Sequence, residues 1–155
     1  MGRVIGIRPL SEEKFRPAFA LIDIAGIEMS VDEWCDQARR LCHGEASDPS
    51  GIMCVESERG HIYGLFSFVL DDREVSRRMI RSDYFVAPNY HGAKVTELMV
   101  HSLETIAQQH QCKEIIIKLS GPVHRQAPAP ETSFGSSLSQ VGYHLKRATF
   151  TKHLG

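Results

Sequence analysis

Hydrophobic residues recur along this chain with two different periods, and each change of period predicts a new element. The apolar run of residues 4–7 predicts a first strand that ends at Arg8-Pro9. After an acidic helix start at residues 11–13, a helical face follows at Phe15, Ala18, Phe19 and Ile22. Pro17 conflicts with this helix because it removes an interior hydrogen bond, so the helix either begins near Phe15 or is kinked. Gly26 is predicted to end it.

A second helix is predicted over residues 31–42 by a capping signal and an apolar stripe. Ser30 and Glu33 have the spacing of a capping box, in which each side chain bonds the other residue's backbone amide. The stripe consists of Val31, Trp34, Cys35, Ala38, Leu41 and Cys42. This spacing favours a core position for Trp34 over a position lining a substrate pocket.

Strand-forming residues predominate in the middle of the chain, over residues 52–56, 61–70 and 75–86. The polar turns between them predict an antiparallel meander. Gly64 lies inside the second strand, where glycine marks either close packing or a bulge. The basic cluster Arg73, Arg77, Arg78 and Arg81 indicates a solvated strand face or, alternatively, a surface for an acidic partner.

The second half of the chain predicts a crossover. An apolar stripe at residues 95–107 indicates a helix, and the β-branched run at 114–119 indicates a buried strand. This strand, helix, strand order implies a parallel strand pair. A loop at 121–132 and a short helix at 134–141 follow, and residues 143–154 predict one or two closing strands.

The amino-acid composition is that of a globular protein and argues against some functions. Hydrophobic residues make up 42% and charged residues 24% of the 155 positions, which suits a single domain over residues 1–155. The 18 basic and 19 acidic residues give a net charge of −1, which argues against a nucleic-acid protein that relies on bulk charge. No apolar run reaches the ~20 residues of a membrane helix, so we expect no membrane partner.

The cysteines predict no metal site and no disulfide framework. Cys35, Cys42, Cys54 and Cys112 lack C-x-x-C spacing, and no histidine completes a zinc pattern. Cys35 and Cys54 are predicted to be buried core thiols. In the absence of a secretion signal, we expect a cytoplasmic protein.

The segment 83–99 is the most informative stretch for function. A strand leads through a turn with Gly92 into a helix start, where unpaired amides and the helix dipole favour an anion such as pyrophosphate. His91 and Lys94 flank this turn. On spacing alone, an ordinary connection between strand and helix is the alternative.

This segment resembles the acetyl-CoA loop of the GNAT acetyltransferases, V-x-P-x-x-R-G-x-G-x-G or A, whose first basic position is Arg or Gln. The matching positions hold Val86, Pro88, His91, Gly92, Lys94 and Thr96. His91 therefore replaces Arg or Gln, and Lys94 and Thr96 occupy the second and third small positions.

The resemblance extends over nearly the whole chain. The predicted element order matches that of the family, and Gly142-Tyr143 with the strand around residues 150–152 is similar to its G-F turn and last strand. The implied fold class is α/β (α+β): a single GNAT-like domain with a mixed central sheet of 6–7 strands flanked by about four helices.

The resemblance also implies site residues. The pantetheine arm of CoA would pair with Phe85, Val86 and their neighbours on the fourth strand. The pyrophosphate would meet the amides of His91, Gly92, Ala93, Lys94, Val95 and Thr96. Asp83 is the candidate catalytic base, with a solvent-exposed strand carboxylate as the alternative.

The position of the family's tyrosine acid holds Leu138, which has no proton to donate. Ser137, Ser139, Tyr84, Tyr90 and His124 are further candidates for that role. Tyr143 is interpreted as core packing, and His101 and His110 as surface histidines.

The implied function is transfer of an acetyl group from acetyl-CoA, as cosubstrate and without a metal, to a primary amine of a small molecule or peptide. The alternative is a non-catalytic member of the same fold that binds a CoA-like ligand or a protein partner, and Leu138 and the altered loop favour it. An unrelated ligand-binding module is a third possibility. The acceptor stays open, and a homodimer through the C-terminal strands is plausible.

Overall fold

The computed structural model describes residues 5–43, 49–71, 78–87, 92–118, 144–146 and 149–154. The described elements, in chain order, are β1 (Ile5–Pro9), the 3-10 helix η1 (Glu12–Lys14), α1 (Phe15–Ile24), α2 (Val31–Cys42), β2 (Ser50–Ser57), β3 (Ile62–Asp71), β4 (Met79–Ser82), β5 (Phe85–Val86), α3 (Gly92–Gln109), β6 (Glu114–Lys118), β7 (His144–Lys146) and β8 (Thr149–His153).

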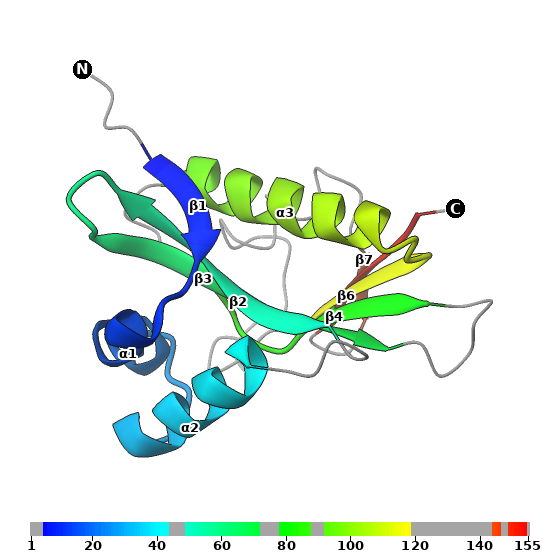
Figure 1. Cartoon of the computed structure of the whole chain (residues 1–155). Coiled ribbons are helices and arrows are strands. Elements are labelled where there is room, and N and C mark those ends of the chain that lie inside the picture. Colours follow the sequence, from blue (N-terminus) through cyan, green and yellow to red (C-terminus); the bar gives the residue numbers. More distant parts are fainter. Residues whose placement is uncertain are drawn as a thin grey trace.

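One mixed sheet forms the middle layer of the molecule. Its strands lie in the order β1-β2-β3-β4-β6-β8-β7, and the short β5 pairs with β3 beside this path. β4 and β6 are parallel, and the other described pairs are antiparallel. Helix α3 covers one face, and α1 with α2 covers the other (Figure 1). The predicted α+β class, meander and crossover are confirmed; the predicted helix at 134–141 lies outside the described residues.

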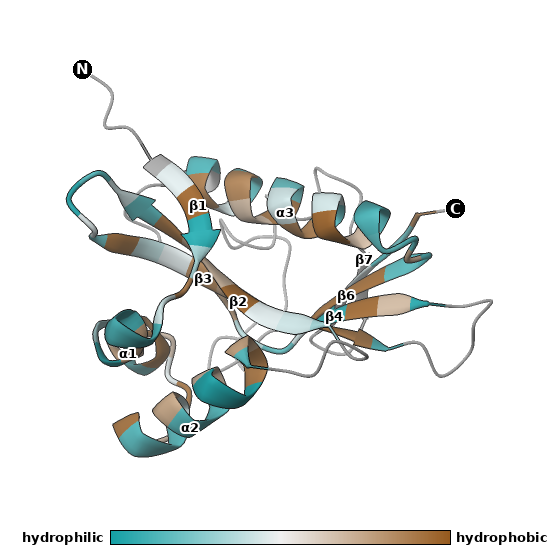
Figure 2. Cartoon of the chain, viewed as in Figure 1, coloured by the Kyte–Doolittle hydropathy of each residue, from teal (hydrophilic) through white to brown (hydrophobic). Residues whose placement is uncertain are grey.

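Each face of the sheet has its own hydrophobic core. Phe66, Ile80 and Leu103 pack in the core between the sheet and α3. Phe15, Trp34 and Leu65 pack in the core between the sheet and the helices α1 and α2. Figure 2 shows that apolar and polar residues alternate along each helix, as expected for helices with one face on a core. Because strand residues alternate between faces, position in a strand decides which core a side chain joins.

Helix α1 begins at Phe15, which places Pro17 in its first turn. Amides of the first turn have no partner within the helix, so proline is tolerated there. This confirms the first of the two alternatives for Pro17. Gly26 follows the helix with φ of 77°, a left-handed conformation that glycine adopts without strain.

The capping box of α2 is present as predicted. Ser30 Oγ accepts from the Glu33 amide at 3.1 Å, and Glu33 Oε2 accepts from the Ser30 amide at 3.0 Å. Trp34 is fully buried, and its indole Nε1 donates to the Phe15 carbonyl at 2.8 Å. Trp34 is thus a core residue that joins α2 to α1.

The two cysteines predicted as core thiols, Cys35 and Cys54, are buried and free. Burial raises the pKa of the Cys54 thiol to about 11, and the charge of Glu56 adds to that effect. The thiol of Cys54 is therefore protonated at neutral pH and unreactive.

Gly64 on β3 is a point of close packing. A Cβ at this position would lie 2.8 Å from Met99 Sδ, 2.9 Å from Val95 Cγ1 and 3.1 Å from the Val86 carbonyl oxygen. The absence of a side chain lets α3 approach β3 at a point beside the Val86 carbonyl of β5. The pairing of β2 with β3 also shifts register between Val55 and Glu56, beside Gly64, so both predicted roles of this glycine are observed.

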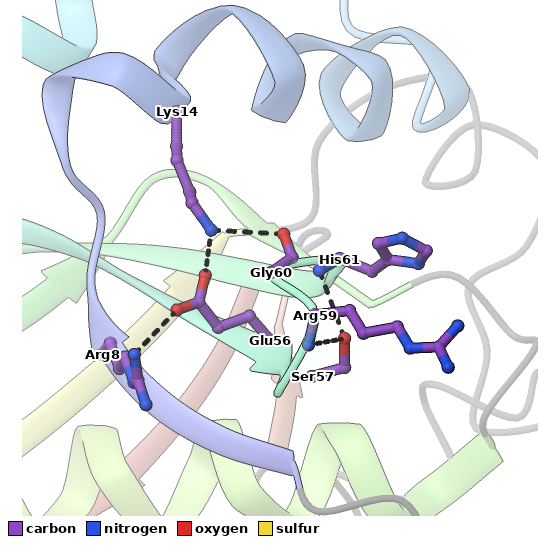
Figure 3. Close-up of polar contacts among 7 residues, drawn as sticks. All are labelled: Arg8, Lys14, Glu56, Ser57, Arg59, Gly60 and His61. Atoms are coloured by element: carbon purple, nitrogen blue, oxygen red, sulfur yellow. Dashed lines mark hydrogen bonds and ion pairs between the residues drawn. The ribbon is translucent and has the colours of Figure 1, made fainter.

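A buried carboxylate joins the helical layer to the hairpin of β2 and β3 (Figure 3). Glu56 Oε2 accepts from Lys14 Nζ at 2.9 Å, and Glu56 Oε1 lies 3.6 Å from Arg8 Nη1. Lys14 Nζ also donates to the Gly60 carbonyl at 3.2 Å. A buried charge needs such partners, and here they fix η1 over the end of the hairpin.

Candidate active site

The strand predicted over residues 75–86 is divided in the structure, which corrects that prediction. Val69 pairs with Arg81, and Phe66 pairs with Phe85. Two residues of β3 therefore face three residues of the opposite strand, 82–84, which is the arrangement of a β-bulge. The bulge ends β4 at Ser82 and gives the two following residues a new direction.

Ser67 on β3 holds the bulge in place. Its Oγ accepts from the Asp83 amide at 3.1 Å and from the Tyr84 amide at 3.0 Å, and its own amide donates to the Tyr84 carbonyl at 2.8 Å. Ser82 Oγ donates to that same carbonyl at 3.1 Å. Both serines are buried, so the polar backbone of the bulge is bonded inside the protein.

The bulge also marks the place where β4 and β6 part. Their parallel pairing runs from Met79 with Glu114 to Ser82 with Ile117. Beyond Ser82 the chain continues as β5, which pairs with β3. We call this point the strand fork and define it by its four residues, Ser82, Asp83, Ile117 and Lys118.

Asp83 lies at the strand fork in an ion-pair cluster. Its Oδ1 accepts from Arg81 Nε at 2.9 Å and lies 3.5 Å from Lys118 Nζ. Ile80 and Ile117 belong to the core under α3. Arg81 and Lys118 follow them along their strands, so they point to the opposite face, that of α1 and α2. The cluster therefore faces the helical layer of α1 and α2.

Tyr84 follows Asp83 in the bulge and packs against the core of that same face. Its ring lies 5.6 Å from that of Trp34 in an edge-to-face arrangement. Burial raises the pKa of the Tyr84 phenol, and the charge of Asp83 adds to the effect. Tyr84 is therefore a weaker proton donor than an ordinary tyrosine.

Phe85 and Val86, the predicted contacts of the pantetheine arm, form β5. Phe85 is buried on the α3 face, where its ring lies 6.1 Å from that of Phe66, and Val86 is buried on the other face. Their side chains thus anchor the strand in both cores. The pantetheine arm would pair with the backbone of β5, and that role stays a prediction.

The first turn of α3 contains the predicted pyrophosphate residues that the structure describes. Gly92 and Ala93 begin the helix, and the side chain of Lys94 is exposed. Val95 and Thr96 are buried, and Val95 packs on Gly64. Only the first amides of a helix are without an intrahelical partner, and here they belong to residues 92–94. The anion role of all these residues stays a prediction.

Several sequence candidates lie outside the described residues. They are His91, in the segment that resembles the acetyl-CoA loop, Leu138 at the position of the family's acid, and Tyr90, His124, Ser137, Ser139 and Tyr143. The predicted roles of these residues stay predictions. His101 is exposed and His110 is half-buried at the end of α3, which agrees with their interpretation as surface histidines.

Sequence reasoning missed the contributions of Ser67, Arg81 and Lys118. A single polar residue in the apolar run LFSFVL was the available signal for Ser67. Arg81 was interpreted as part of a solvated basic face, whereas its side chain is 32% exposed and pairs with Asp83. Lys118 follows three isoleucines, and only the sheet register shows that it lies beside Asp83.

A pocket of about 340 Å³ lies elsewhere, between η1, the end of α2 and the start of β2. Its lining includes Leu10, Phe15, Ile52 and Phe68, and none of the strand-fork residues. Among the described residues, no three His, Cys, Asp or Glu side chains gather into a metal site. No helix in this described part is long and apolar enough to cross a membrane.

Solved structures of acetyltransferases have the same fold. A GNAT-family acetyltransferase from Staphylococcus aureus aligns with a TM-score of 0.67 at 12% identity, covering 98% of this chain and 100% of that chain. The NatC complex bound to Gag peptide and CoA contains a chain that aligns with a TM-score of 0.67 at 14% identity, covering 97% and 99%. An aminoglycoside antibiotic 6'-N-acetyltransferase from Acinetobacter baumannii aligns with a TM-score of 0.66 at 16% identity, covering 92% of each chain.

Identity this low shows a shared fold alone, and no curated protein sequence matches the chain. The family model of the GNAT acetyltransferases, however, matches residues 15–128 of the sequence. That match includes the bulge, the strand fork, the first turn of α3 and the residues between β5 and α3. The chain therefore belongs to the GNAT acetyltransferase family.

Proposed function

We propose that this protein transfers an acetyl group from acetyl-CoA to a primary amine. The observation that carries the proposal is the strand fork, because it places a polar cluster where two parallel strands separate. In open α/β sheets, ligands bind beyond the carboxyl ends of the strands. The family match supports acetyl-CoA as the donor.

The proposed CoA site runs from β5 to the start of α3. The pantetheine arm would pair with the backbone around Phe85 and Val86 as an added strand. The pyrophosphate would lie at the amides of Gly92, Ala93 and Lys94, where the helix dipole and the lysine charge favour an anion. The packing of Val95 on Gly64, close to the Val86 carbonyl, holds these two parts side by side.

The chemistry needs a neutral amine and a place for the proton that the nitrogen loses. Asp83 is the carboxylate at the strand fork, and we assign it the role of base. Arg81 fixes its orientation at 2.9 Å. The acceptor would approach from the face of α1 and α2, toward which the cluster points.

The acceptor class proposed here is a primary amine of a small molecule or a peptide. Two similar structures support this range, since one is an aminoglycoside acetyltransferase and the other is a complex bound to a peptide. We also propose a cytoplasmic location, in keeping with four free cysteines. We propose a homodimer through the C-terminal strands, since β7 lies at one edge of the described sheet.

Calorimetry with acetyl-CoA tests the CoA site, and Lys94→Glu is the informative variant. Reversing the charge at the first turn of α3 should weaken binding about tenfold, because it opposes the phosphates. Lys113→Glu is the matched control. Lys113 is exposed and lies just before β6, away from the proposed CoA site, so the substitution should leave affinity unchanged. Absence of binding heat at millimolar acetyl-CoA would contradict the proposed site.

A non-catalytic, CoA-binding role is the second candidate, and a specific observation favours it. Leu138 stands at the position of the family's acid, and Lys94 and Thr96 occupy two positions that are small residues in the family's acetyl-CoA loop. Turnover assays with a polyamine, an amino sugar, an aminoglycoside and a peptide distinguish the two candidates. Tight CoA binding without acetylation of any amine would favour the non-catalytic role.

A further inference from the structure

The two residues that follow the last paired positions of the strand fork face each other. Ser82 and Ile117 are the last pair of β4 and β6. Asp83 and Lys118 come next, and Lys118 Nζ lies 3.5 Å from Asp83 Oδ1. An anion and a cation therefore stand on opposite sides of the opening between the strands.

The two members of this pair are held differently. Asp83 Oδ1 also accepts from Arg81 Nε, which is a directional hydrogen bond from a permanently charged group. The side chain of Lys118 is 51% exposed, against 33% for Asp83. Because Arg81 already provides Asp83 with a cation, Lys118 is not needed to balance the carboxylate.

Acetyl transfer to an amine requires an acid as well as a base, because the CoA sulfur leaves as a thiolate. Leu138 cannot supply that proton. Tyr84 is close to the strand fork, but its ring packs against Trp34 in the core and its pKa is raised. Among the described residues at the strand fork, the ammonium of Lys118 carries transferable protons.

We propose that Lys118 is the catalytic acid of this enzyme and works as a pair with Asp83. This inference rests on the proposed acetyl transfer and adds to it the source of the leaving group's proton. In this proposal, the acid and the base both come from strand ends of the sheet, and the acid does not come from the C-terminal segment that contains Leu138.

The proposed step balances as follows. The amine nitrogen forms a bond to the thioester carbonyl carbon, and the carbon–sulfur bond breaks with its electron pair on sulfur. Asp83 takes the proton that the nitrogen loses, and Lys118 gives a proton to the sulfur, so CoA leaves as a thiol. Transfer of the proton from Asp83 to the neutral Lys118 amine, across the gap between them, then restores both groups.

Lys118→Arg separates an acid role from a purely electrostatic one. Arginine keeps the positive charge and an ion pair with Asp83, but it does not give up its proton in proteins. We expect Lys118→Arg and Lys118→Met each to lower kcat by about 10²–10⁴-fold. The acetyl-CoA Kd, measured by calorimetry, should stay within about threefold of wild type, because neither substitution touches the proposed phosphate site. Lys113→Arg is the matched control and should retain wild-type kcat.

The outcomes separate this inference from the proposed function. Wild-type turnover that persists in Lys118→Arg but falls in Lys118→Met would overturn the acid role and leave a structural ion pair. Wild type that binds acetyl-CoA but acetylates no amine would also overturn it. Wild type that does not bind acetyl-CoA would reject the proposed function itself. Because Lys118 is half exposed, both variants should fold, and unchanged melting temperatures verify this.

Discussion

Ser67 is the residue whose single hydroxyl sets the geometry of the site. Its Oγ accepts from two backbone amides of the bulge, and it is 1% exposed. Water cannot readily replace a buried acceptor, so each amide depends on this oxygen. A residue that lies one strand away from the proposed chemistry therefore maintains the break between β4 and β5.

Ser67→Ala should lower the free energy of unfolding by about 2 kcal/mol, the cost of leaving buried amides without an acceptor. Urea denaturation measures this loss. Ser57→Ala is the matched control, because Ser57 Oγ also accepts from two amides, those of Arg59 and His61, in an exposed turn (Figure 3). There water can replace the hydroxyl, so we expect a loss of well under 1 kcal/mol. Equal losses in the two variants would show that burial does not decide the cost.

Residue-scale predictions from sequence succeeded where the cause is local. The alternative in which α1 begins near Phe15 depends on the first turn alone. Gly64 predicted a close approach but not its partners, Val95 and Met99, which come from α3. The ion pair of Asp83 with Lys118 joins residues 35 positions apart in sequence. No pattern within one segment contains that information, because the register of the sheet brings the two together.

At the scale of elements, the capping box of α2 shows how much a local signal can predict. Ser30 and Glu33 satisfy each other's amides as their spacing indicated. The strand predicted over 75–86 shows the opposite case. The bulge adds one residue, so Ile80 and Phe85, which are five positions apart, lie on the same face of the sheet. Strand-forming residues continue across the break between β4 and β5, so the sequence predicted one strand there.

Ser30→Ala should destabilise the protein by about 1 kcal/mol, because the Glu33 amide loses its acceptor and the first turn of α2 its cap. Ser11→Ala offers a control within the same layer, since Ser11 precedes η1 without any side-chain cap bond. Thermal unfolding of both variants measures the difference. A melting temperature for Ser30→Ala as high as that of Ser11→Ala would contradict the stabilising role of the box.

At the scale of the whole molecule, the sheet separates two hydrophobic cores, and each supports a different part of the proposed site. The core under α3 holds the helix whose first turn is the proposed phosphate site. The core under α1 and α2 supports the face on which Asp83 and Lys118 meet. The strand fork connects the two, which explains why its residues were the hardest to predict: their neighbours come from both halves of the chain.

Trp34 is the only tryptophan of the chain, and this gives the protein a built-in optical reporter. The indole is fully buried and lies 5.6 Å from the ring of Tyr84, which belongs to the bulge. Occupancy of the strand fork should alter the surroundings of Tyr84 and, through it, the fluorescence of Trp34. We expect acetyl-CoA to change the Trp34 emission over the same concentration range as the calorimetric binding. Tyr84→Phe should reduce this change. Emission that stays constant at saturating acetyl-CoA would contradict the expected coupling. The intrinsic fluorescence of the protein would then report binding at the strand fork without an added label.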